Sequence, residues 1–100
     1  MLLLFESIYA VDEFSHVQHL GYATEERIYN FTLVFSEQFF GKTMVICLQT
    51  GKSTLLDFDD ARNISVIKNA FHIEEDPSAH EISTLLLSKI PRYKHFEEYS

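Results

Sequence analysis

The alternation of apolar and polar residues over positions 28–35 predicts a β-strand. Every second residue from Tyr29 to Phe35 is large and apolar, and Asn30 and Thr32 stand between them. Because successive side chains of a strand point to opposite faces, one face of this strand should pack on a core. A weaker alternation over residues 17–23 predicts another strand, which we expect at an edge of the sheet.

Two more strands are expected after this one, each preceded by a glycine-containing loop or turn. Residues 43–49 are apolar on both faces, which is typical of a strand that is covered on both sides or lies at the centre of a sheet under helices. Residues 53–58 form the next strand, after a tight turn in which Gly51 supplies the positive φ. Short turns join all four strands, so neighbours should pair antiparallel as a meander.

The C-terminal part of the chain has the periodicity of helices. Asp57, Asp59 and Asp60 supply carboxylates for a helix start, and apolar residues follow them at helical spacing. The β-branched run within residues 61–71 also fits a strand, so the choice between helix and strand stays open there. Further on, Asp76 as N-cap and Pro77 as the first helical residue predict another helix.

These patterns together predict one α+β domain over residues 1–91. It consists of a four-stranded antiparallel meander sheet with two C-terminal helices packed on one face. Pro91 stops the last helix, and residues 92–100 form an aromatic and charged C-terminal tail. A single domain agrees with the length of 100 residues.

The charge of the chain argues against binding to nucleic acid. The sequence has 15 Asp and Glu against 8 Lys and Arg, a formal net charge of −7. Phosphate backbones would repel its acidic clusters, so we expect neither nucleic acid nor a membrane as partner. The only cysteine, Cys47, cannot form an internal disulfide, and the apolar run at the N-terminus stops at Glu6, too soon for a signal peptide or a membrane span. We therefore expect a cytoplasmic protein.

Two short segments, residues 41–43 and 51–53, imitate the end of a phosphate-binding P-loop. Both read Gly-Lys followed by a hydroxyl residue, but Ser36 and Ile46 stand where the leading glycine is required. Each is also followed by an expected strand, whereas a P-loop leads into a helix. Hairpin turns explain both segments better. The alternative function is a small-molecule or phosphate-ligand domain, with Lys42, Lys52 and Ser53 meeting at adjacent hairpin ends.

The sequence contains no motif for catalysis or metal binding. His16 and His19 would be the first metal ligands to consider, but their odd separation puts them on opposite faces of a strand. One cysteine cannot supply a cysteine cluster, and no G-x-S-x-G motif is present. We therefore predict no catalytic residue, no metal and no cofactor.

The run FFGKTMVICLQTGKSTLL at residues 39–56, with strands before it and acidic helices after it, resembles a known family. It is similar to a small group of uncharacterised Firmicutes proteins of about this length, described as a domain of unknown function. The resemblance covers most of the chain. It implies a bacterial cytosolic protein with one α+β domain, and it brings no catalytic residues.

The adjacent aromatic residues Phe39 and Phe40 are the candidate interaction site. A loop seldom places two adjacent phenylalanines in water without a partner, although both rings could instead cap one end of the core. Tyr93 and Phe96 of the tail would extend the same surface. We therefore predict a protein-interaction or self-assembly module without catalytic activity, which binds a protein partner or forms a homodimer.

Overall fold

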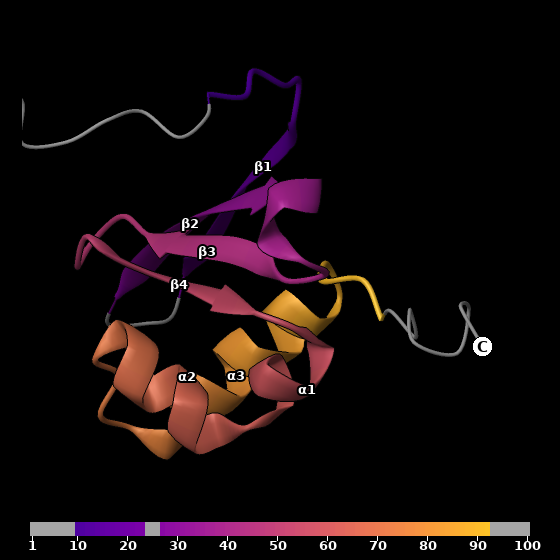
Figure 1. Ribbon diagram of the computed structural model, residues 1–100. Helices are drawn as coiled ribbons and strands as arrows, with labels where there is room; N and C mark the ends of the chain where they lie inside the picture. The colour runs from indigo at the N-terminus through magenta and orange to yellow at the C-terminus, as the bar shows by residue number, and fades with distance from the viewer. Residues whose placement is uncertain (1–9, 24–26, 93–100) are drawn as a thin grey trace, which may run out of the picture.

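The computed structural model describes residues 10–23 and 27–92, which form a four-stranded sheet with three α-helices packed on one of its faces (Figure 1). The strands are β1 (His16–Ala23), β2 (Ile28–Phe35), β3 (Thr43–Cys47) and β4 (Lys52–Leu56). Their order in the sheet is β1-β2-β3-β4, and each neighbouring pair is antiparallel. The predicted meander is therefore confirmed, with β1 at an edge.

The helices are α1 (Phe58–Arg62), α2 (Ile64–Phe71) and α3 (Asp76–Leu87), and a short 3-10 helix, η1 (Glu37–Phe39), lies between β2 and β3. Residues 61–71, for which sequence left helix and strand open, are helical on both sides of a break at Asn63. The Asn63 side chain accepts hydrogen bonds from the backbone N–H groups of Ser65 and Val66, so it ends α1 and starts α2.

The start of α3 differs by one residue from the prediction. The N-cap is Glu75 rather than Asp76, and its side chain makes no capping hydrogen bond. The carboxylate of Asp76 instead lies 2.5 Å from Lys68 Nζ on α2. This contact and the positive charge of Lys68 hold the pKa of Asp76 below its usual value. The predicted N-cap thus joins α3 to α2.

The core lies between the helices and one face of the sheet. Phe31, Leu33 and Val45 on the strands are fully buried, and the Phe31 ring meets Phe71 of α2 edge to face, with 5.4 Å between the ring centroids. The thiol of Cys47 is buried in the same core. The helices contribute Ala61, Ile67, Phe71, Ala79, Ile82 and Leu86.

β3 lies at the centre of the sheet, and the helices cover only one of its faces. Val45 and Cys47 point to the helices and are fully buried, whereas Met44 and Ile46 are only partly buried on the opposite face. Of the two interpretations of residues 43–49, the central strand under helices agrees with the structure. Within residues 10–23 and 27–92, no α-helix covers the other side of the sheet, which therefore lacks the second covering layer.

Candidate functional site

The two hairpin lysines lie at opposite ends of the β3–β4 hairpin. The strand register pairs Thr43, next to Lys42, with Leu56, and it pairs Cys47 with Lys52. Five residues of extended strand separate the two ends by roughly 15 Å. Ser53 follows Lys52 and points to the other face of the sheet, because successive strand residues alternate. The structure does not bring Lys42, Lys52 and Ser53 together, so this arrangement gives no support to a shared anion site.

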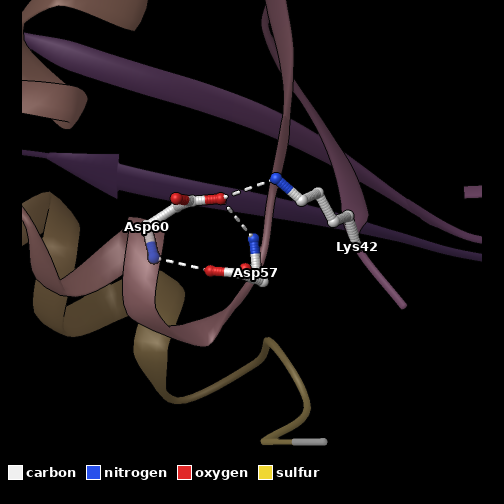
Figure 2. A network of polar contacts seen from close by, with 3 residues as sticks. All are labelled: Lys42, Asp57 and Asp60. Carbon is white, nitrogen blue, oxygen red and sulfur yellow. Dashed lines mark hydrogen bonds and ion pairs between the residues drawn. The ribbon is translucent and has the colours of Figure 1, made fainter. Parts of the chain in front are cut away.

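Lys42 takes part in a polar network at the start of α1, which Figure 2 shows with Asp57 and Asp60. Asp57 accepts a hydrogen bond from the Asp60 N–H at 2.7 Å, and Asp60 accepts one from the Asp57 N–H at 3.1 Å. This reciprocal capping box starts the helix. Lys42 Nζ lies 3.2 Å from the same Asp60 carboxylate. The predicted role of these carboxylates at a helix start is thus confirmed.

The electrostatics of Asp60 reflect a balance of opposing effects. Partial burial raises the pKa of its carboxyl, but the Asp57 N–H and the Lys42 ammonium outweigh burial, so the pKa lies below its ordinary value. The network therefore keeps Asp60 ionised and ties α1 to the loop before β3. Both carboxylates are engaged in holding the fold together.

The two histidines considered as metal ligands are separated by the sheet. His19 Nδ1 lies 2.9 Å from Thr32 Oγ1 of β2, on the face away from the helices. His16, on the opposite face, lies beside the Phe35 ring at 5.3 Å between centroids. Within residues 10–23 and 27–92, no group of three or more His, Cys, Asp or Glu is placed to hold a metal ion.

A shallow groove of about 400 Å³ lies where β1 meets α3. Its lining residues are Tyr22, His80, Glu81, Thr84 and Leu85. The Tyr22 hydroxyl donates a hydrogen bond to the Glu81 carboxylate, which raises the pKa of Tyr22 to about 12. The Thr84 hydroxyl donates to the carbonyl of His80 at 3.0 Å. The Tyr22 and Glu81 side chains are thus paired with each other, and the Thr84 hydroxyl is bonded to the backbone of its own helix.

The two candidate residues Phe39 and Phe40 lie in the same turn but differ in their exposure to solvent. Phe39 ends η1 and is partly buried, whereas the Phe40 side chain is 87% exposed. Phe40 has a positive φ of 55°, and Gly41 follows with a φ of 86°. The backbone therefore turns Phe40 away from the molecule. Only one of the two rings remains available as an exposed anchor.

The C-terminal candidates, Tyr93 and Phe96, lie outside the described residues. Arg92, just before them, lies over the Phe58 ring at the start of α1, with its guanidinium carbon 5.1 Å from the ring centroid. The chain thus leaves the described part of the molecule beside α1.

We call the side of the sheet that is turned away from helices α1, α2 and α3 the open face (Figure 1). It carries every second residue of each strand, and Leu48 continues it beyond β3 by donating its N–H to the Asn30 carbonyl at 2.9 Å. Its described residues are Val17, His19, Gly21, Ala23, Ile28, Asn30, Thr32, Val34, Met44, Ile46, Leu48, Ser53 and Leu55.

Four apolar residues of the open face form a continuous row across all four strands. The register aligns Val17 with Val34, Val34 with Met44, and Met44 with Leu55. We call these four residues the apolar row. Its two ends are well exposed, at 46% for Val17 and 38% for Leu55. Neighbouring side chains on one face of a sheet contact each other, so the row forms one connected patch.

The open face carries more than half of the exposed large apolar residues of the described chain, counted by number. Within the described ranges, seven large apolar side chains are exposed, and four of them, Val17, Ile28, Leu48 and Leu55, belong to this face. None of its described residues is Asp, Glu, Lys or Arg. A connected apolar patch without charges is typical of a surface that binds another molecule.

The hydrophobic pattern of the sequence already contains a signal for the open face. Residues 43–49 are apolar on both faces, and helices were expected on only one face of the sheet. With helices on one face only, Met44, Ile46 and Leu48 have no helix to cover them. The candidate site residues are therefore those of the open face, with Phe40 as a separate exposed ring.

The chain matches the model of one protein family. The family model described as SAV0927-like matches residues 8–88, so the chain belongs to this family, a small uncharacterised one named after a Staphylococcus protein. This confirms the expectation of an uncharacterised domain family. A comparison with curated proteins gives no match. Among the described helices, none combines the length and the hydrophobicity that crossing a membrane requires.

Proposed function

We propose that this member of the SAV0927-like family is a protein-interaction or self-assembly module without catalytic activity, and that the open face is its contact surface. The observation that supports this most directly is the apolar row, which crosses all four strands through residues none of which is charged. The chain has a net charge of −7, so a face without carboxylates is a marked departure from its average surface.

Burial of the open face by a partner would be favourable. Fully burying an exposed Val or Leu side chain gives about 1.5–3 kcal/mol relative to leaving it in water. Val17, Ile28, Leu48 and Leu55 are already held by the sheet backbone, so they lose little further freedom on binding.

Phe40 is a second element of the proposal. Its side chain is exposed on the η1 loop, and aromatic anchors are enriched at protein interfaces. Tyr93 and Phe96 remain candidates for the same role. We place the module in the cytoplasm. Its partner is a protein rather than a nucleic acid, because the excess of carboxylates in the chain would repel phosphates.

Site-specific photo-crosslinking tests the contact surface. A photoreactive amino acid at Leu55, in the apolar row, should give crosslinked protein adducts in cells that produce the chain. The same group at Val11, equally apolar and 55% exposed but outside the sheet, is the matched control and should give few. Equal yields of adducts at both positions, or none at Leu55, would contradict the proposal.

A further inference from the structure

We infer that the occupant of the open face is a second copy of this chain, packed sheet against sheet in a two-fold symmetric dimer. The inference rests on the proposed function and adds the identity of the partner. It follows from where the charges of the molecule lie, from the arrangement of the apolar row and from the size of the face.

The charge distribution favours a second copy. The acidic clusters at residues 57–60 and 74–76 belong to the helix layer and its loops, on the other side of the sheet. In a dimer that buries the open face, the two sheets pack about 10 Å apart and both helix layers are outermost. The clusters of the two copies are then farther apart than the screening length of about 8 Å at physiological salt. The repulsion between two acidic molecules that meet through this face is therefore long-range, and salt can screen it.

A partner of another kind finds less to recognise on this face. The described residues of the open face offer no carboxylate to a basic protein and no cation to an acidic one. Charge pairs between partners contribute to specificity and to the rate of encounter, and both contributions are missing here. A partner can therefore recognise this face only by its shape and its apolar area.

The apolar row is compatible with two-fold symmetry. A two-fold dimer uses the same patch on both copies, so the patch must be complementary to itself. The row runs straight across the sheet with its midpoint between Val34 and Met44. Consider a two-fold axis that lies between the two sheets, directly above this midpoint. Whether the axis runs along the strands or across them, the rotation places the apolar row of one copy over the apolar row of the other. The polar residues His19 and Thr32 then lie beside the apolar contact, where they bond to each other.

The size of the face predicts a dimer of moderate affinity. Four strands spaced about 4.8 Å apart and some six residues long give a footprint of roughly 400 Å² on each copy. Two copies then bury on the order of 800–1,000 Å², which is less than the roughly 1,200 Å² at which stable interfaces begin. We therefore expect a dimer that forms at micromolar concentrations and dissociates on dilution.

Analytical ultracentrifugation of the full chain over micromolar to submillimolar concentrations tests the inference. The wild type should show a monomer–dimer equilibrium. Leu55→Glu should raise the dissociation constant at least about tenfold, because it places a carboxylate in the apolar contact. Val17→Glu should act similarly, whereas Val11→Glu, the same change outside the sheet, should leave the equilibrium unchanged. Circular dichroism shows whether each variant is folded.

A second measurement locates the interface directly and does not depend on variants. In a mixture of isotope-labelled and unlabelled chains, intermolecular NOEs should connect the methyl groups of Val34 and Met44. A wild type that stays monomeric at all concentrations overturns the inference, and so do equal effects of Leu55→Glu and Val11→Glu. Intramolecular NOEs from residues 1–9 to Met44 in a monomer would assign the face to the chain's own N-terminus and overturn it as well.

The inference and the proposed function fail in different ways. If the chain is monomeric while the group at Leu55 forms adducts of the mass expected for another protein, the second copy is wrong and the interaction module stands. If the chain is monomeric and no adduct forms, both are wrong. An adduct of twice the mass of the chain, together with a monomer–dimer equilibrium, supports both.

Discussion

The hydrogen bond between Tyr22 and Glu81 joins the edge strand β1 to the helix layer. Tyr22 belongs to β1 and Glu81 to α3, and the carboxylate favours the protonated hydroxyl that donates to it. This contact, reinforced by some burial and by the negative charge of Glu81, raises the pKa of Tyr22 to about 12. The ordinary value for tyrosine is about 10. The contribution to stability is therefore present below pH 10 and is lost as the pH rises through about 12.

Replacing Glu81 by Gln should lower the pKa of Tyr22 toward its ordinary value, because the amide no longer carries the negative charge that favours the protonated hydroxyl. Carbon NMR of labelled tyrosine rings over an alkaline pH series can follow each of the five tyrosines separately. Glu74→Gln, the same change in the loop before α3, is the control and should leave the pKa of Tyr22 unchanged. An unchanged titration in Glu81→Gln would show that this hydrogen bond does not set the pKa.

At the scale of elements, α1 depends on its capping box, because a helix of five residues has few hydrogen bonds of its own. Asp57→Ala should lower the free energy of unfolding by about 1 kcal/mol, within a range of about 0.5–2 kcal/mol. Asp59→Ala is the matched control. The Asp59 side chain is 86% exposed and only pairs with Arg62 at 3.4 Å, so its removal should change stability by less than about 0.5 kcal/mol. Urea denaturation measures both, and equal losses would contradict the assignment of Asp57 as the cap.

The elements that could be predicted from sequence are those fixed by local patterns. The alternation over residues 28–35 gave the bounds of β2, and the carboxylates after β4 gave the start of α1. The displaced start of α3 could not be predicted, because Asp76 is held by Lys68, a residue of another helix. The break at Asn63 had a local signal, since asparagine is a strong N-cap residue, but the apolar spacing on both sides of it also fits one continuous helix.

The candidate site was less predictable than the fold, because it depends on how the elements are placed together. Lys42 and Lys52 sit in successive turns of the meander, and successive turns lie at opposite ends of an antiparallel sheet. The expected meeting of these lysines was therefore inconsistent with the predicted topology itself. The apolar row is visible only once the register is known, since its four members are scattered over residues 17–55.

The whole molecule has two unlike sides. The helix layer carries the acidic clusters, whereas the described part of the open face carries none of the charges that make the chain acidic. Net charge of one sign keeps molecules apart in solution, and an uncharged apolar face brings them together. The oligomeric state should therefore depend on which of these two effects dominates, and ionic strength changes only the first of them directly.

Added salt should strengthen the self-association of this chain. Two copies that each carry a net charge of −7 repel at long range, and shortening the screening length from about 10 Å at 0.1 M to about 3 Å at 1 M salt removes most of that repulsion. The apolar contact between the open faces is not weakened by the same change. We expect the dissociation constant of the dimer to fall roughly two- to tenfold over this range. Sedimentation equilibrium in sodium chloride measures it, and Leu55→Glu should remain the weaker dimer at every salt concentration. A dimer that dissociates as salt is added would show that ion pairs outside the open face hold the two copies together.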